Sequence, residues 1–408
     1  MKRLFAVITT LLLAGCTSFG EGNPYEEALR TVRVQAVYPA GYEEFARSGV
    51  AVTAREISSA NTYVARTDAA GGVTFRMPAG IYRISVADRA NASTVFNGSL
   101  EEVRLTAEMD LRLPLVYSRA GSIVFKELYF GGCSKAPEDG RMFNDQYVIL
   151  HNNDSEVQYL DGLCFGAVDP APSSAVNNWV TKTESGELVF QAFAPINECV
   201  WRFKGSGTDF PLAPGEDAVV ALMGAVDFAA EFPLSVNLNK AGYFVCFSRQ
   251  HFPHEKLNPS PGDQIQPSHI LDVPKQTGGG GSNKAYSVSI MSPALVIFRP
   301  EQGFDLDAYL ADDSRSVATV PGGSTKCVKV PWEWILDGVE VFYSTNNNKR
   351  IAPVADAGAF PFSVNYQGHT IHRLLDGEAS EKAGYAIYTD TNNSSNDFEE
   401  RPTQSLHE

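Results

Sequence analysis

The chain has 408 residues, of which 44% are hydrophobic and 20% are charged, with 34 glycines and 23 prolines. This composition is typical of a globular protein rather than a disordered one, and the length predicts two or three domains. The formal net charge is −15. A chain of this charge without a long basic run is a poor nucleic-acid binder, because neutralising phosphates requires clustered lysine and arginine. Abundant aromatic and β-branched residues, with turn residues at short spacing, favour an all-β fold.

The N-terminus has the pattern of a bacterial lipoprotein leader. A lysine and an arginine follow the initial methionine, and residues 4–13 form an apolar stretch that is too short for an ordinary membrane-spanning helix. Residues 13–16 (Leu-Ala-Gly-Cys) resemble a lipobox. We therefore expect residues 1–15 to be a signal peptide, and its removal takes two cations and changes the formal charge from −15 to −17. Cys16 would then carry acyl chains. A plain secretory signal that happens to contain a cysteine is the alternative.

Residues 16–30 are expected to form a lipid-anchored tether. Thr17 stands where an aspartate would favour retention in the inner membrane. Three acidic residues of the tether, Glu21, Glu26 and Glu27, resemble the acidic export signals of Bacteroidetes-type surface lipoproteins. The prediction is a lipid-anchored protein of the outer membrane that is displayed on the cell surface, with a periplasmic orientation left open.

Five further cysteines follow the lipidation site: Cys133, Cys164, Cys199, Cys246 and Cys327. An exported protein can form disulfides, and a bridge between Cys133 and Cys164 is one candidate. The odd number leaves at least one thiol unpaired within a monomer. No Cys-x-x-Cys or metal-type spacing is present, and burial of several thiols as apolar side chains is the alternative.

The first folded unit is predicted over residues 31–117. Residues 32–36 and 50–54 alternate between apolar and polar side chains, which is typical of half-buried strands. Residues 67–86 then contain an Asp- and Gly-rich turn, a strand with phenylalanine, a Pro-Ala-Gly turn and another apolar strand. Seven or eight short strands in this span predict a small β-sandwich.

Residues 67–86 resemble the carboxypeptidase-regulatory-like, or prealbumin-like, sandwich. That family has a Thr-Asp-x-x-Gly turn, a strand with Phe, and then Pro-x-Gly-x-Tyr-x-x-x-Val, and this segment carries both pieces. The resemblance implies a structural or spacer role, sometimes with carbohydrate or partner contacts at the loop tips, and it implies no catalysis. A spacer that lifts the next domain from the membrane is the simpler interpretation.

A second and larger β-sandwich is predicted over residues 119–405. A strand bearing Glu127 is followed by Tyr-Val-x-Leu-x-Asn at residues 147–152 and by a strand at residues 159–165, with Asx-rich turns between them. This order resembles that of lamin-tail-like, Ig-like domains. Later blocks at residues 210–222, 370–373 and 390–398 continue the resemblance.

With two further blocks at residues 235–247 and 330–340, the combination is similar to an uncharacterised family of Bacteroidetes outer-membrane lipoproteins, a domain of unknown function. Long insertions separate the blocks, and long ordered insertions on a sandwich often form binding loops. Residues 166–209 hold two tryptophans, and residues 251–283 hold three histidines, which include His251 and His254, and the stretch Gly278–Gly281. We identify Trp179, Trp201, His251 and His254 as candidate ligand or partner contacts. Packing of both tryptophans in a local core is the alternative.

The sequence offers no catalytic or metal motif. His251 and His254 lack the i, i+4 spacing of a zinc hydrolase, and Pro253 lies between them. Residues 390–401 imitate the first half of a calcium loop, but Ser395 and Arg401 replace its glycine and its glutamate. The Gly-x-Ser-x-Gly elbow, the phosphate-binding loop and the dinucleotide fingerprint are absent from the sequence. We therefore predict a protein that is not an enzyme and has no cofactor.

The predicted function is that of a non-catalytic outer-membrane lipoprotein acting as a binding or accessory module. The family resemblance implies nutrient capture beside a TonB-dependent transporter, with a small molecule, a peptide or a glycan as ligand. Two alternatives stay open: a secreted hydrolase with its site in the 166–210 and 251–283 loops, and a structural adhesin or scaffold.

Overall fold

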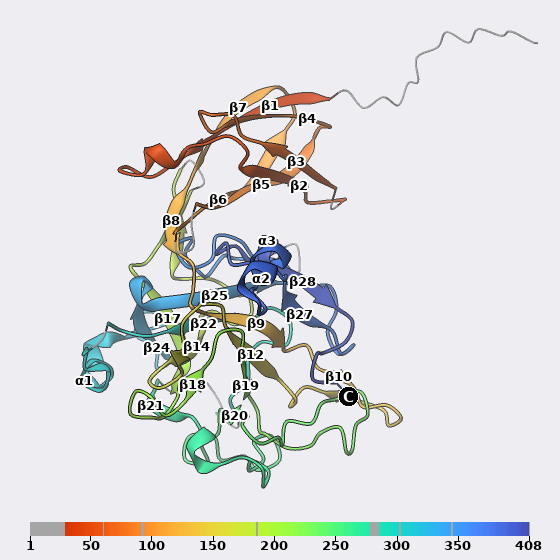
Figure 1. Ribbon diagram of the computed structural model, residues 1–408. Coiled ribbons are helices and arrows are strands. Elements are labelled where there is room, and N and C mark those ends of the chain that lie inside the picture. The colour runs from red at the N-terminus through yellow and green to blue at the C-terminus, as the bar shows by residue number, and fades with distance from the viewer. Residues whose placement is uncertain are drawn as a thin grey trace, which may run out of the picture.

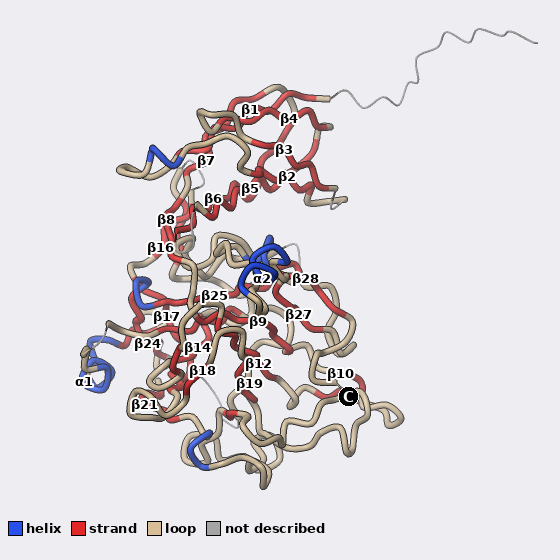
Figure 2. Tube along the Cα trace, in the orientation of Figure 1, coloured by secondary structure: helices blue, strands red, loops and turns tan. Residues whose placement is uncertain are grey.

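The computed structural model describes residues 29–407 except for residues 60, 91–93, 185–186, 278–284, 302 and 344–345. The predicted signal peptide, the lipidation site Cys16, nearly all of the tether and Gly278–Gly281 lie outside these described residues. Strands dominate the described chain, and the predicted all-β sandwich class is confirmed (Figures 1 and 2). Over the same described residues, no helix is both long enough and apolar enough to cross a membrane.

The first sandwich lies at one end of the molecule, and strand β8 leads from it toward the second (Figure 1). Its smaller sheet has the order β4 (Gly72–Met77), β1 (Arg30–Val37) and β7 (Met109–Pro114). Its larger sheet has the order β3 (Thr62–Arg66), β2 (Ala51–Glu56), β5 (Gly80–Arg89), β6 (Thr94–Leu105) and β8 (Val116–Arg119). Strands β1 and β7 are parallel, and the other pairs are antiparallel.

Alternating side chains fill the first sandwich as the sequence pattern indicates. Val32 and Val34 of β1 and Val52 of β2 point into one apolar cluster and are at most 2% exposed. The predicted turn before β4 is closed by Asp68, whose Oδ1 accepts hydrogen bonds from the backbone nitrogens of Ala70 and Gly72, both at 2.9 Å. An Asx side chain that binds the backbone in this way fixes the turn and sets the register of β4 against β1.

Two larger sheets form the second sandwich. The six-stranded sheet has the order β20 (Phe244–Val245), β19 (Asp217–Ala221), β12 (Tyr147–Asn152), β9 (Ile123–Tyr129), β27 (Thr370–Arg373) and β28 (Phe398–Arg401). The eight-stranded sheet has the order β23 (Ser316–Ala318), β24 (Lys326–Pro331), β17 (Phe193–Arg202), β14 (Cys164–Val168), β22 (Ala294–Phe298), β25 (Ile335–Phe342) and β26 (Phe360–Pro361), with β21 (Asp272–Gln276) paired to β17.

Short elements decorate these sheets. Short strands of two or three residues form three separate pairs. These are β10 (Cys133–Ser134) with β11 (Arg141–Met142), β13 (Gln158–Tyr159) with β18 (Pro211–Leu212), and β15 (Val180–Lys182) with β16 (Leu188–Phe190). The α-helices are α1 (Leu306–Ala311), α2 (Gly377–Ala383) and α3 (Ser394–Asp397). The 3-10 helices are η1 (Glu43–Phe45), η2 (Pro267–His269), η3 (Asp313–Arg315) and η4 (Trp332–Trp334). The aspartate caps of α1 and α2 each accept a backbone hydrogen bond, which satisfies one free donor at the helix start.

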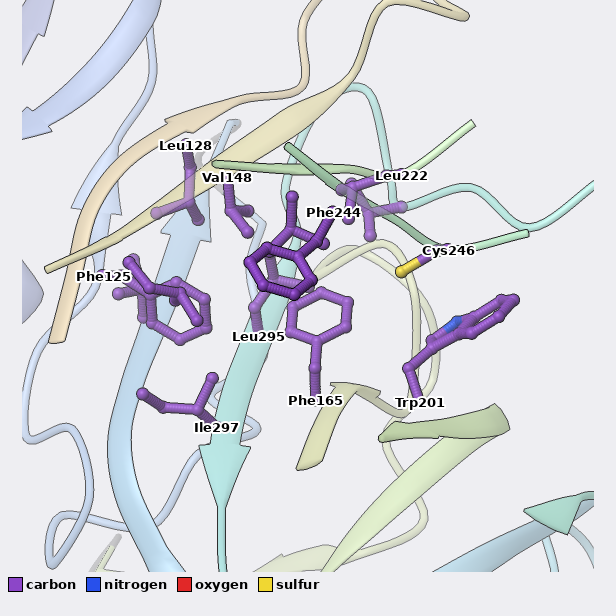
Figure 3. Packing of buried hydrophobic residues seen from close by; sticks show 14 of the residues in the cluster. Phe125, Leu128, Val148, Phe165, Trp201, Leu222, Phe244, Cys246, Leu295 and Ile297 are labelled. Carbon is purple, nitrogen blue, oxygen red and sulfur yellow. The ribbon is translucent and has the colours of Figure 1, made fainter. Parts of the chain in front are cut away.

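The main core lies between the two large sheets. Figure 3 shows Val148 from one sheet and Phe165 and Leu295 from the other meeting in this layer. These three side chains are at most 2% exposed. Burying large apolar side chains from both sheets in one layer is the dominant stabilisation of such a sandwich.

Both large sheets are also covered on their outer faces. Tyr147 and Ile149 of β12 point away from the main core into a cluster with Val236 and Leu238, which come from the long segment after β19. On the other sheet, the outward residues of β22 pack with Leu310 of α1. A strand that is covered on both faces loses its polar positions, which explains the continuously buried run of β12.

Two buried arginines tie loops to the second sandwich. Arg350 is 1% exposed, and its Nε donates to Glu340 Oε1 at 2.9 Å while Lys349 Nζ binds Glu340 Oε2 at 2.5 Å. Arg373 on β27, also 1% exposed, pairs with Asp337 at 2.6 Å and binds the C-terminal segment through two more aspartates. Those two aspartates, Asp390 and Asp397, lie in the calcium-like segment, so this segment carries a structural ion-pair network.

The cysteines correct one expectation. All five described cysteines are free and buried, so the candidate bridge between Cys133 and Cys164 does not form. Cys133 lies on β10, where its sulfur is 3.6 Å from Asp145 Oδ2, whereas Cys164 lies on β14 and faces the outer cluster of the eight-stranded sheet. The thiols thus behave as small apolar side chains.

Candidate functional site

The two tryptophans singled out by the sequence are packed inside the protein. Trp201 is 0% exposed, and its ring lies 5.3 Å from that of Tyr286 and 5.9 Å from that of Phe252. Trp179 is 7% exposed, and its Nε1 donates to Asp169 Oδ2 at 2.8 Å. These positions place both rings in the packing rather than on an open surface, and Trp201 belongs to the main core.

The two histidines lie in the second insertion with separate partners. His251 Nδ1 is 2.6 Å from Gln276 Oε1, and His254 Nδ1 accepts a hydrogen bond from the backbone nitrogen of Leu257 at 3.1 Å. Within the described part of the chain, no group of three or more His, Cys, Asp and Glu residues is placed to hold a metal ion. The structure therefore does not bring the four candidate contacts together into one site.

A cleft of about 480 Å³ opens instead where the first insertion meets the chain that leads into β22. We call it the Glu198 cleft. One wall comes from β14, the loop after it and the middle of β17, and the other comes from residues 286–291. Its lining residues are Phe143, Ala167, Ala171, Pro172, Asn197, Glu198, Tyr286, Ser287, Val288, Ser289, Ile290, Met291 and Tyr366. Its size is within the range of small-ligand sites.

Glu198 sits on a β-bulge of β17. Pairing with β14 runs from Trp201 to Phe165 and resumes at Asn197 with Ala167, so the bulged strand carries extra residues. Glu198 itself has φ of 59°, a left-handed conformation that is rare for a residue with a branched or long side chain. Bulges of this kind re-aim side chains, and strained backbone concentrates at functional sites.

The sheet explains why the bulge occurs at this point. Before it, Ile196 pairs with β24, and after it Cys199 pairs with β21, so β17 changes its neighbour within three residues. The opposite strand has Gly166 here, where a Cβ atom would lie 2.5 Å from Ile196 Cγ2. The carbonyl of Glu198 accepts a hydrogen bond from the backbone nitrogen of Thr277 at 2.8 Å, which holds the bulge in place.

The carboxyl group of Glu198 is partly buried, and no described cation pairs with it. Among the described residues, Glu198 Oε2 is shielded from solvent and has no hydrogen-bond partner. Burial raises the pKa of this carboxyl from its ordinary value of 4.5 to about 7. A carboxyl whose charge is disfavoured in this way, in a cleft, is a candidate for ligand recognition.

Tyr286 supplies a second unpartnered group. Its side chain is 2% exposed, and its ring is held by the rings of Phe165, Trp201 and Phe252 at centroid distances of 5.3 to 6.4 Å. No described residue makes a hydrogen bond with its hydroxyl. Burial, with added effects from neighbours that include Glu198, raises the pKa of Tyr286 well above its ordinary value, so the hydroxyl stays protonated.

The wall that carries Tyr286 is fixed by a buried amide. Gln146, which is 0% exposed, accepts from the backbone nitrogen of Val288 and donates to the carbonyl of the same residue, both at 3.2 Å. Its Nε2 also donates to the carbonyl of Phe130 at 2.9 Å. The segment is therefore clamped to the six-stranded sheet, and a ligand would meet a preformed wall rather than have to order it.

A second hollow of about 470 Å³ lies near β18 and β19. It has three acids, but each is already engaged. Asp217 pairs with His151 at 2.7 Å and with Lys126 at 2.5 Å, Glu216 accepts from the nitrogen of Ala213 at 2.8 Å, and Asp209 accepts from Ser206 at 2.9 Å. A carboxylate that already has hydrogen-bond or ion-pair partners gains little free energy from contact with a ligand. The Glu198 cleft is therefore the stronger candidate for a binding site.

A family model matches the C-terminal part of the chain. Residues 213–405 match the model of DUF4876, described as a protein of unknown function. The chain is similar to the crystal structure of a DUF4876 family protein from Bacteroides thetaiotaomicron, with 26% identity, a TM-score of 0.57, and 91% of this chain and 94% of that chain covered. No curated protein matches the chain.

Other solved structures are only faintly similar. A DUF3823 family protein from Parabacteroides merdae is 9% identical, with a TM-score of 0.18 over 36% of this chain and 68% of that chain. The major pilin subunit of Bacillus cereus is 10% identical, with a TM-score of 0.19 over 83% of this chain and 99% of that chain. Likenesses at this level carry no functional argument, and the lamin-tail-like and carboxypeptidase-regulatory-like resemblances stay predictions. Residues 213–405 are therefore similar to the DUF4876 family, which is described as of unknown function.

Proposed function

We propose that this protein is a non-catalytic, lipid-anchored binding protein of the outer membrane, which captures a small nutrient at the cell surface beside a TonB-dependent transporter. The observation that carries the binding role is the Glu198 cleft, where two shielded polar groups have no hydrogen-bond partner among the described residues. The lipoprotein-like leader, ending at Cys16, supports the anchored location. The transporter partnership follows from the family resemblance of the second sandwich.

The energetics favour a bound ligand in this cleft. Leaving a buried hydrogen-bonding group unpaired costs about 1–3 kcal/mol. Within the part of the chain that the structure describes, Glu198 Oε2 and the Tyr286 hydroxyl both carry this cost. A ligand that hydrogen-bonds to both groups removes the cost when it binds, while its remaining atoms gain from the apolar lining.

A cleft-filling substitution tests the binding role. Ala171 lines the cleft and is exposed, so Ala171→Trp should fill the opening without disturbing the core. Ser174, an exposed residue three positions later that does not line the cleft, gives the control Ser174→Trp. We expect native mass spectrometry of the protein purified from membranes to find a bound small molecule in the wild type and in Ser174→Trp but not in Ala171→Trp. Finding no bound molecule, or equal binding in all three proteins, contradicts the proposal.

The transporter partnership needs a separate test. The wild-type protein, cross-linked at native abundance and purified from outer membranes, should bring down a TonB-dependent transporter. An unrelated outer-membrane lipoprotein with the same affinity tag is the control. Recovery of the protein alone, or of the same transporter with the control, contradicts this part of the proposal and leaves the binding cleft to the first experiment.

A further inference from the structure

We infer that the Glu198 cleft takes a ligand with a protonated amine on an apolar body, in which the amine pairs with the Glu198 carboxylate and the body lies along residues 286–291. This inference rests on the proposed binding role and adds the chemical class of the ligand. It is carried by the charges around Glu198, by the lining of the cleft and by the position of Tyr286.

The charges around Glu198 favour a cationic group on the ligand. Among the described residues, no lysine, arginine or histidine is paired with Glu198, and burial is the one cause that raises the pKa of its carboxyl. Two fully buried acids of the second sandwich have cationic partners, Glu340 in Arg350 and Asp337 in Arg373. Asp145, which lies inside the fold and not in the cleft, is instead bound by the hydroxyl groups of Tyr129 and Ser235. An ammonium group from a ligand would supply the cationic partner that no described residue provides. Such pairing is favourable because a buried carboxylate is stabilised chiefly by an opposite charge.

The lining of the cleft calls for an apolar body. Phe143, Pro172, Val288, Ile290 and Met291 contribute apolar side chains to its walls. In the wall formed by residues 286–291, the hydroxyl of Ser289 already accepts hydrogen bonds from the backbone nitrogens of Met291 and Ser292. A highly hydroxylated ligand would leave many of its polar groups unpaired against such walls, which costs free energy.

Tyr286 adds a second hydrogen-bonding group to the lining of the cleft. Its proton is retained because the pKa of the phenol is raised well above its ordinary value, mainly by burial. Its ring cannot swing away, since three aromatic neighbours hold it. The hydroxyl can therefore accept one N–H of the amine or donate to a neighbouring acceptor atom of the ligand.

Three matched probes test the inference on the full-length protein near neutral pH. They are 2-phenylethylamine, the neutral 2-phenylethanol and the anionic 3-phenylpropionate, and calorimetry measures their affinities. We expect the amine to bind about tenfold more tightly than the alcohol, because a charge-assisted hydrogen bond is roughly twice as strong as a neutral one, and the anion to bind most weakly. Glu198→Gln should abolish the preference for the amine, whereas Tyr286→Phe, which keeps the carboxylate, should retain it.

The outcomes separate this inference from the proposed function. If the three probes bind the wild type equally and none binds Ala171→Trp, the cleft is a binding site but does not select a cation, so the inference fails and the binding role stands. If none of the probes binds the wild type, the inference also fails, and the mass-spectrometric experiment alone decides the binding role. The comparison of amine with alcohol uses the wild type, so it holds even if the Glu198 variant does not fold.

Discussion

Arg350 shows how this protein treats a charge that it buries. Its guanidinium donates to Glu340 and to the carbonyl oxygens of Pro170, Ser292 and Val341, at distances between 2.9 and 3.1 Å. Removing one partner from such a pair typically costs about 3–5 kcal/mol, because the other charge is left buried and alone. Among the described residues, Glu198 Oε2 has no partner, and because Glu198 lines a cleft, we argue that its carboxyl group serves a ligand rather than the fold.

The unpaired Glu198 carboxyl should make folding stability depend on pH in a defined window. Its pKa is raised from 4.5 to about 7 in the folded protein. Between these two values the folded protein holds a proton that the unfolded chain has released, so stability falls as pH rises through the window. Below it both states are protonated and the penalty vanishes, and above it the penalty reaches about 3 kcal/mol at most. Glu198→Gln cannot titrate, so we expect it to gain stability over the wild type as pH rises from about 5 to 8.

Urea unfolding of both proteins at the two ends of this pH window measures the effect. Other buried acids titrate in both proteins, so the difference between them isolates position 198. The nearby Tyr286, Cys199 and Cys246 stay neutral throughout, because burial raises each of their pKa values well above the ordinary one. Glu44→Gln, at an exposed site, is the control and should show no such trend. An advantage of the Glu198 variant that is equal at both pH values would contradict the assignment.

At the scale of elements, the two sandwiches differ in how far the sequence predicts them. In the first, buried side chains alternate with exposed ones along β1 and with half-buried ones along β2, so the period-two pattern indicates both strands correctly. In the second, insertions cover the outer faces of the sheets, and strands such as β12 and β22 have no exposed face. Their apolar runs indicate strands but do not tell which side chains face which layer.

The candidate site was missed by sequence reasoning for a related reason. Glu198 is one acid among many in an acidic chain, and its importance comes from a bulge formed where β17 exchanges β24 for β21. No local motif encodes an exchange of strand partners. The two tryptophans that the sequence singles out are instead packed inside the protein. Trp201 belongs to the main core and Trp179 is 7% exposed, because burying a large aromatic ring is strongly favourable.

Because the outer face of the six-stranded sheet is covered, we predict that shortening an outward-facing side chain of β12 is destabilising. Ile149 is 3% exposed and packs in the outer cluster, so Ile149→Ala should cost about 2–5 kcal/mol of stability through lost burial and the cavity left behind. A sheet with a solvated outer face would lose almost nothing. Val189 on β16 is 47% exposed, and Val189→Ala should stay within about 0.5 kcal/mol.

Urea midpoints of the two variants against the wild type check this prediction. Both positions belong to the second sandwich, so both substitutions report on the same folded unit. Equal midpoints for the two variants would mean that the insertion does not seal the outer face of the six-stranded sheet.

At the scale of the whole molecule, the strand layers place a small sandwich before a larger one that holds the cleft (Figure 1). The first sandwich is complete in itself, since its apolar cluster draws on residues from Val32 to Leu115. The second closes its layers with segments far apart in the chain, as Gln146 and Val288 show at the cleft wall. If the leader is cleaved as predicted, the small sandwich stands between the lipid and the cleft and acts as the spacer expected from its family resemblance.

If the leader is cleaved as predicted, attachment of the protein to the membrane depends on Cys16 alone. Cys16→Ser removes the thiol that would carry the acyl chains, and each buried methylene of such chains contributes about 0.8 kcal/mol to membrane binding. We expect the variant to move from the membrane fraction to the soluble extracytoplasmic fraction, while Thr17→Ala, which keeps the cysteine, stays with the membrane. Fractionation followed by immunoblotting measures the distribution, and the released variant should still bind the amine probe, because the cleft lies in the second sandwich. A Cys16→Ser protein that remains with the membrane would show that something other than a lipid on Cys16 holds it there.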